Sequence, residues 1–105
     1  MKIILIDDDN SYRELLKHYL DDMKLTSLIV DEASTFTSSL TMIEENDYDA
    51  IILELFLPDS EGLETIKHMM KHLEGIGKNI PVLILTGHED YSIGKWFKCP
   101  CHSTG

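Results

Sequence analysis

The sequence predicts an α/β fold in which a doubly wound parallel sheet carries helices on both faces. Four short apolar runs are continuous rather than alternating, as strands covered on both faces require. Between the runs, apolar residues recur at helical spacing. The runs cover residues 3–6, 27–30, 50–53 and 82–85. Strands that alternate with helices predict one domain with right-handed crossovers, and 105 residues suffice for one such domain.

The segment after the first run predicts an amphipathic helix with a single apolar stripe. The stripe contains Tyr12, Leu15, Leu16, Tyr19, Leu20 and Met23. Asn10 or Ser11 stands where an N-cap residue is expected.

Two later segments show the same period. The second helix is expected to bury Ala33, Phe36, Leu40 and Ile43, and the third Leu63, Ile66, Met70 and Leu73. Ser34 is the expected N-cap of the second helix, and Asp59 or Ser60 that of the third. The third helix is expected to end at the segment 75–77, which contains two glycines.

The residues beyond the fourth run do not predict a complete further strand and helix. Lys95–Lys98 is compatible with a short strand or with the end of a helix. We therefore expect a domain over residues 1–91, a degenerate or frayed tail over residues 92–105, and a fifth strand that is missing or degenerate. A fourth strand without a neighbour is an open edge, which predicts a homodimer or a partner that covers it.

Composition and charge exclude several classes of protein. Nine Lys and Arg against nineteen Asp and Glu give a net charge of −10, which disfavours nucleic acid and anionic membranes as partners. Cys99 and Cys101 are too close in sequence to close a stabilising loop, so a reducing compartment is expected. No apolar run is long enough to cross a bilayer, and no signal peptide is evident. These features predict a cytoplasmic protein.

Acidic side chains collect where the predicted strands end. Residues 7–9 are three aspartates after the first strand, Glu54 ends the third, and Thr86 follows the fourth. The carboxyl ends of parallel strands meet at one edge of the sheet, and repulsion between carboxylates there favours a hard cation such as Mg²⁺ or a nearby Lys. The alternative is a solvated loop that caps the first helix, a role that suffices for Asp9. The sequence thus predicts an acidic, metal-binding site.

Three motifs occur in a fixed order: Ile-Leu-Ile-Asp-Asp-Asp ending at Asp9, Leu-Pro-Asp-Ser-Glu-Gly over residues 57–62, and Ile-Leu-Thr-Gly over residues 84–87. With Arg13, their order and spacing over residues 2–91 resemble the receiver domain of two-component response regulators. The resemblance implies a flavodoxin-like sheet of strand order 2-1-3-4. It also implies a phosphorelay switching module rather than an enzyme, with a histidine kinase or a downstream signalling protein as partner.

The resemblance also implies roles for individual residues. Asp7 and Asp8 would hold Mg²⁺, with the backbone carbonyl of Phe56 as a further ligand. Glu54 would occupy the phosphoacceptor position next to the metal, and Thr86 would be the switch hydroxyl. Lys98 is a weak candidate for the lysine that follows the fifth strand in the family.

Glu54 departs from the family, which has Asp at this position. Its carboxylate reaches one methylene further and would crowd the place where metal and phosphorus meet, and in-line transfer tolerates little displacement. Two outcomes stay open. Glu54 either accepts a hydrogen bond from Thr86 and imitates the activated state, or it abolishes the switch.

An alternative, enzyme-like pattern starts at the end of the first predicted strand. Asp7, Asp9 and Ser11 after an apolar strand, with Thr86 after a later one, also resemble haloacid-dehalogenase-type phosphatases, in which Asp7 would be the nucleophile. That family needs a Lys and a second acidic pair, for which Glu89 and Asp90 are poor substitutes.

Two groups of potential soft metal ligands are expected to have no metal role. His68 and His72 are four residues apart on the third helix, where they are expected to be exposed and to lack further ligands. Cys99, Cys101 and His102 lie together near the end of the chain without a second ligand cluster elsewhere.

Overall fold

A computed structural model describes residues 1–23, 27–85 and 95–97 of the chain, the last three by their backbone. Its main sheet has the strand order β2-β1-β3-β6-β7. The strands are β1 (Lys2–Ile6), β2 (Ile29–Ala33), β3 (Ala50–Glu54), β6 (Val82–Leu85) and β7 (Lys95–Phe97), and the helices are α1 (Asn10–Asp22), α2 (Phe36–Glu45) and α3 (Leu63–Gly75). The strands β2, β1, β3 and β6 are parallel to one another. Since β6 is the fourth predicted strand, this confirms the predicted fold class and the order 2-1-3-4.

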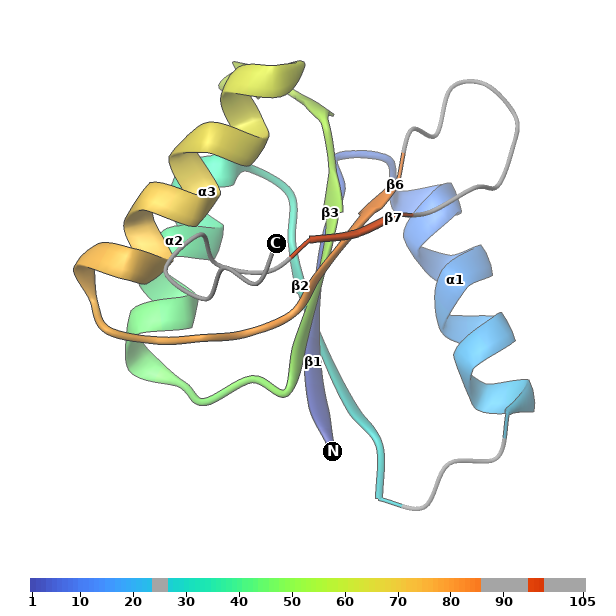
Figure 1. Ribbon diagram of the computed structural model, residues 1–105. Coiled ribbons are helices and arrows are strands. Elements are labelled where there is room, and N and C mark those ends of the chain that lie inside the picture. Colours follow the sequence, from blue (N-terminus) through green and yellow to red (C-terminus); the bar gives the residue numbers. More distant parts are fainter. Residues whose placement is uncertain (24–26, 86–94, 98–105) are drawn as a thin grey trace.

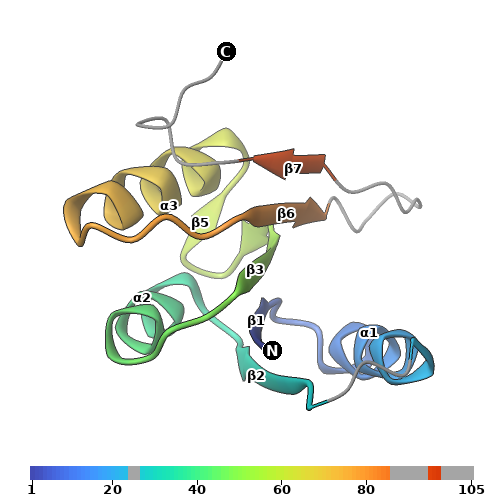
Figure 2. The ribbon, with the colours of Figure 1, turned by 60° about the horizontal axis from the view of Figure 1, so that its bottom comes forward.

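The helices cover the two faces of the sheet unequally. Figures 1 and 2 show α2 and α3 together on one side of the sheet and α1 on the other. Successive side chains of a strand point to opposite faces, so every strand contributes side chains to both faces of the sheet. In β1, Ile4 and Ile6 join the core under α2 and α3, whereas Ile3 and Leu5 join the smaller cluster under α1. No helix in the described ranges is both long and apolar enough to span a membrane.

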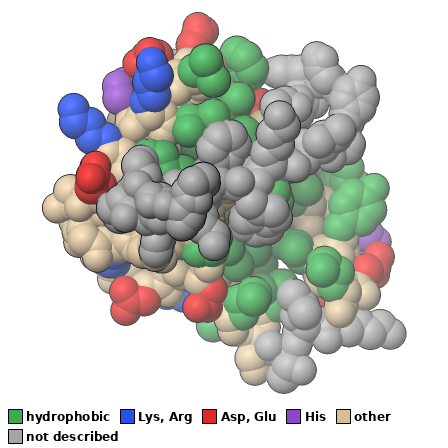
Figure 3. All heavy atoms as spheres, in the orientation of Figure 1, with side chains coloured by type: hydrophobic (Ala, Val, Ile, Leu, Met, Phe, Trp, Pro, Cys, Tyr) green, Lys and Arg blue, Asp and Glu red, His purple; other side chains and the backbone are tan. Residues whose placement is uncertain are grey.

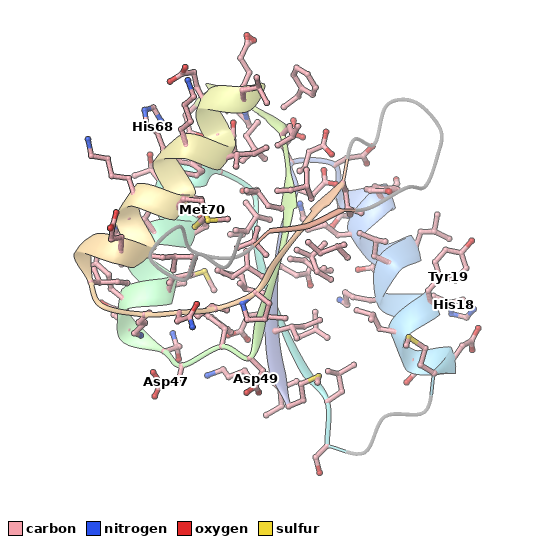
Figure 4. The ribbon with its side chains drawn as sticks, viewed as in Figure 1. His18, Tyr19, Asp47, Asp49, His68 and Met70 are labelled. Carbon is pink, nitrogen blue, oxygen red and sulfur yellow. The ribbon has the colours of Figure 1, made fainter. Side chains whose placement is uncertain are left out.

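The predicted apolar stripe of α1 is only half buried. Tyr12, Leu16 and Leu20 pack against the sheet. Leu15, Tyr19 and Met23 are instead 44%, 57% and 61% exposed. A helix turns 100° per residue, so Leu15 and Tyr19 lie at one side of an arc that is wider than the face that α1 presents to the sheet, whereas Met23 lies beyond the last helical residue, Asp22. Figure 4 shows Tyr19 and His18 projecting away from the sheet, and Figure 3 shows hydrophobic side chains at the surface on the side of α1.

The helix starts differ from the predicted ones. Asp9 caps α1, because its carboxylate accepts hydrogen bonds from the backbone N–H groups of Ser11 and Tyr12 at 2.9 and 3.2 Å. Thr35 caps α2, and Gly62 takes the N-cap position of α3 without a side-chain hydrogen bond. The predicted caps at Asn10 or Ser11, Ser34, and Asp59 or Ser60 were therefore wrong by one to three residues. Ala33, predicted on the second helix, ends β2 instead.

A short hairpin follows β3 and explains the Leu-Pro-Asp-Ser-Glu-Gly motif. It pairs β4 (Phe56–Leu57) with β5 (Ser60–Glu61) in antiparallel fashion around the turn at Pro58 and Asp59. Gly62 follows with φ at +67°, a conformation that side chains with a Cβ rarely adopt. The Gly62 N–H donates to the Leu55 carbonyl at 2.9 Å, which folds the hairpin back against the end of β3.

The fifth strand is present but runs in the opposite direction. β7 pairs with β6 in antiparallel register, with Val82 beside Phe97 and Ile84 beside Lys95. Of the two alternatives left open for residues 95–98, the strand holds for residues 95–97. The expectation of an open edge along the fourth strand is thus wrong for Val82–Ile84. This pairing removes the reason for predicting a homodimer through that edge.

Candidate functional site

Strand register brings Asp7 and Glu54 to neighbouring positions at the carboxyl edge of the sheet. Ile6 pairs with Leu53, and Asp7 and Glu54 are the residues that directly follow this pair. Both are 4% exposed although they are acidic. Leu5 and Ile52, two residues earlier, lie in the cluster under α1, so alternation directs Asp7 and Glu54 to the same side.

Tyr12 on α1 lies beside both carboxylates. The pKa of its phenol is raised, first by burial and then by the negative charges of Asp7 and Glu54. An ionised phenolate would be repelled by both groups, so Tyr12 remains a neutral hydroxyl at this edge. Asp7, Glu54 and Tyr12 therefore form one local environment under the first turn of α1.

The β1–α1 loop fixes Asp7 through its backbone and its side chain. The Asp7 N–H donates to the Ala33 carbonyl at 3.0 Å, and Asp7 Oδ1 accepts from the Asp9 N–H at 2.9 Å. Burial raises the pKa of Asp7, and the charges of Asp8 and Asp9 raise it further. The Asp9 N–H and the Arg13 guanidinium act in the opposite direction. The Asp7 carboxylate is thus held in place at a site where a cation would relieve both its burial and the repulsion from its neighbours.

The donor set fits Mg²⁺ with an open coordination shell. Mg²⁺ in proteins keeps several waters and takes one or two carboxylates. Asp7 and Asp8 are two carboxylates adjacent in sequence, and Phe56, whose main-chain oxygen the family resemblance implies as a further ligand, lies in the hairpin after β3. Within residues 1–23 and 27–85, no three His, Cys, Asp or Glu side chains are grouped to hold a metal ion. The candidate metal site therefore depends on two carboxylates and main-chain oxygen.

Asp59 has a structural role that the sequence did not reveal. Its carboxylate reaches from the hairpin to the start of α2 and accepts from the Phe36 N–H at 2.8 Å, the Thr37 N–H at 2.9 Å and Thr37 Oγ1 at 2.7 Å. Thr65 Oγ1 donates to the Leu55 carbonyl at 2.9 Å and meets Ser60 Oγ at 2.8 Å. These contacts join the hairpin to both α2 and α3.

Arg13 was noted only as part of a motif, yet it contacts the site directly. Its guanidinium donates to the Asp7 carbonyl, to Glu32 Oε1 on β2 at 2.7 Å and to Asn10 Oδ1 at 3.1 Å. The sequence does not single out its partner Glu32, which lies beyond the predicted strand over residues 27–30 and 19 residues from Arg13.

The two histidines of α3 differ in their surroundings. His68 is exposed as predicted and points outward in Figure 4, at 3.7 Å from Glu64 Oε1. The prediction was wrong for His72, whose side chain is 18% exposed, with Nε2 at 3.3 Å from Glu44 Oε2 on α2. The two rings therefore do not form one exposed pair.

Other predicted residues lie outside the described part of the chain. They are Thr86, Lys98, Cys99, Cys101 and His102, together with Glu89 and Asp90.

A family model for the response regulator receiver domain matches residues 3–96. The transcriptional regulatory protein SrrA of Staphylococcus aureus is 32% identical over 85 residues, which are 81% of this chain and 32% of SrrA. The chain thus spans about a third of the length of this relative.

Two solved structures show the same fold. The complex of histidine kinase ThkA with response regulator TrrA matches with a TM-score of 0.67 and 26% identity, over 88% of this chain and 73% of that one. The Mg²⁺ complex of the receiver domain of histidine kinase CKI1 from Arabidopsis thaliana matches with a TM-score of 0.68 and 19% identity, over 87% and 70%. The motifs, the sheet order and these matches lead to one conclusion: the chain belongs to the response regulator receiver domain family of two-component signalling.

Proposed function

We propose that this receiver is an atypical one, which signals through protein–protein contacts without accepting a phosphoryl group itself. The observation that carries the proposal is Glu54, buried at the acceptor position one residue beyond the Leu53–Ile84 pair. Its partner would be a histidine kinase or a downstream signalling protein. The ThkA–TrrA complex, in which a histidine kinase binds a response regulator, supports this choice.

The chemical reason is the length of the Glu side chain. Phosphoryl transfer needs the attacking oxygen, the phosphorus and the leaving oxygen in line, and a misplacement of about 1 Å costs roughly 100-fold in rate. An extra methylene at Glu54 moves the carboxylate oxygens by a comparable distance. The burial of Glu54 leaves it little room to swing away.

In this proposal Asp7, Asp8 and the Phe56 carbonyl would hold Mg²⁺. Glu54, expected from the sequence near the same ion, would occupy the phosphoacceptor position, since no three acidic side chains are grouped around one metal position among the described residues. Mg²⁺ would supply positive charge that neutralises the acidic edge. Thr86 would act as the responsive hydroxyl and Lys98 as a weak candidate for the family lysine. The division into a receiver unit over residues 1–91 and a tail over residues 92–105 stays a prediction.

The phosphatase interpretation loses its basis. The hairpin after β3 accounts for the motif over residues 57–62, and the family match accounts for the acidic loop after β1. Asp7 is therefore proposed as a metal ligand rather than as a nucleophile.

The test is intact mass after incubation with Mg²⁺ and a small-molecule phosphodonor. We expect Glu54→Asp to gain one phosphoryl group and the wild type to gain none. Glu54→Asp combined with Asp7→Asn is the control, and it should stay unmodified because the metal pair is broken. A phosphorylated wild type would overturn the proposal, and an unmodified Glu54→Asp variant would show that the rest of the site is not competent.

A second measurement separates a fixed active state from a lost switch. Glu54→Gln keeps the length of the side chain and removes its charge. If Glu54 imitates the activated state, backbone NMR shifts after β6, over residues 86–90, should differ between the variant and the wild type. Identical shifts would favour a lost switch.

A further inference from the structure

We propose that Arg13 is a positioning residue for the metal-binding carboxylates, because it clamps the peptide unit between Asp7 and Asp8 to the edge strand β2. This inference rests on the proposed Mg²⁺ site and assigns a further residue to it. Arg13 itself would not touch the metal.

The clamp uses the three nitrogens of the guanidinium separately. Nη1 donates to the Asp7 carbonyl, Nε to Glu32 Oε1 at 2.7 Å, and Nη2 to Asn10 Oδ1 at 3.1 Å. The side chain is 13% exposed, so water competes little for these bonds. One planar group therefore joins the β1–α1 loop, the start of α1 and β2.

Glu32 is itself held from two sides. Its second oxygen accepts from Lys17 Nζ at 2.8 Å, and the hydrogen bonds from Lys17 and Arg13 lower the pKa of Glu32. An ionised Glu32 that accepts a hydrogen bond on each carboxylate oxygen holds the guanidinium firmly. The next residue on β2, Ala33, accepts from the Asp7 N–H, so both peptide units of Asp7 are fixed from the same strand.

Asp8 shows why this clamp matters for the metal. Its side chain is exposed, and among the described residues it has no hydrogen bond or ion pair of its own. Its direction is set by the backbone, and the Asp7 carbonyl belongs to the peptide unit that leads into Asp8. Mg²⁺ demands near-ideal octahedral geometry, so a rotation of that peptide would separate the two carboxylates.

The chain offers a graded set of variants. Arg13→Lys keeps the charge but cannot make the separate hydrogen bonds of the planar guanidinium, and Arg13→Gln loses the charge as well. Glu32→Gln keeps an acceptor for the guanidinium. Lys67→Gln is the matched control, because Lys67 lies on α3, on the opposite face of the sheet from α1, is 70% exposed and pairs with Glu64 on its own helix. The Mg²⁺ dissociation constant is measured by calorimetry, and the melting temperature and the exchange rate of the Asp9 amide are measured without metal.

Arg13→Lys and Arg13→Gln should weaken Mg²⁺ binding by about 10-fold, as expected for an outer-shell partner of a metal ligand. The Asp9 amide should exchange faster in both variants, whereas Lys67→Gln should leave affinity and exchange unchanged. Wild-type affinity in Arg13→Lys would overturn the positioning role and leave the Mg²⁺ site standing. An equal loss of Mg²⁺ affinity in Lys67→Gln, in step with a lower melting temperature, would also overturn the positioning role. A wild type that binds no Mg²⁺ would overturn the metal site itself.

Discussion

The two faces of the sheet divide stability and chemistry between them. The face under α2 and α3 has the larger core, which contains Ile43, Leu53 and Leu73 without exposed surface. The face under α1 has a smaller cluster and carries Tyr12, with Asp7 and Glu54 directed to the same side. Buried carboxylates oppose folding, so they are tolerated where fewer apolar groups depend on tight packing. The site therefore occupies the layer with the smaller apolar cluster.

The largest expected effect tests this division directly. Leu73→Ala on α3 should lower the free energy of unfolding by about 3 kcal/mol, because a fully buried Leu leaves a cavity. Leu16→Ala on α1 should cost about 1 kcal/mol, since Leu16 is only partly buried. Urea unfolding of both variants gives the two values. Equal losses would break the comparison.

Asp59 is expected to have the next largest effect. Asp59→Ala should cost about 1 kcal/mol, because the start of α2 loses its capping carboxylate. The hydrogen bond from the Thr37 N–H is the main cause that lowers the pKa of Asp59. The Asp59 carboxylate therefore stabilises the fold above its unfolded pKa, and this stabilisation is lost as the pH falls through the folded pKa. In urea unfolding, the difference in the free energy of unfolding between Asp59→Ala and wild type should be smaller below about pH 4 than at neutral pH.

Asp47→Ala is the control for this pair of measurements, since Asp47 is 99% exposed and its carboxylate lies at 3.3 Å from Lys78 Nζ. Figure 4 shows it projecting from the loop before β3. A loss at Asp59 that is independent of pH would contradict the role given to its charge.

The smallest expected effect is a gain in stability, whereas the preceding variants are expected to lose stability. Asp7→Asn should stabilise the metal-free protein at pH 7 by less than about 1 kcal/mol, a gain reduced by solvent screening. Burial raises the folded pKa of Asp7, so its ionisation opposes folding. The gain should be absent below the unfolded pKa and grow as the pH rises through the folded pKa. Thermal unfolding in EDTA at several pH values measures this gain, with the exposed Asp47→Asn as the control. A loss of stability at pH 7 in Asp7→Asn would contradict the prediction.

Much of this arrangement could be predicted from the sequence because it depends on local patterns. Continuous apolar runs gave the parallel strands, and the ends of those runs brought Asp7 and Glu54 to one edge. The clamp between Arg13 and Glu32 could not be predicted in the same way, because its partners lie 19 residues apart on different elements. The exposure of Leu15 and Tyr19 depends on how much of α1 the sheet can cover, which periodicity does not measure.

The direction of the last strand illustrates the same limit. A strand of one lysine and two aromatic residues is compatible with either direction, and only the path of the backbone decides it. The sequence therefore allowed a degenerate fifth strand without specifying that β7 runs antiparallel to β6.

That reversal has a consequence for the order of folding. β1, β2, β3 and β6 reach their neighbours only after a crossover that contains a helix, so each pairing closes a long loop. The antiparallel pairing of β6 with β7 joins segments that are close in sequence, and its loop-closure entropy is correspondingly lower. The outermost pairing of the sheet is therefore its most local one, and it closes the shortest loop of all the strand pairings in this sheet.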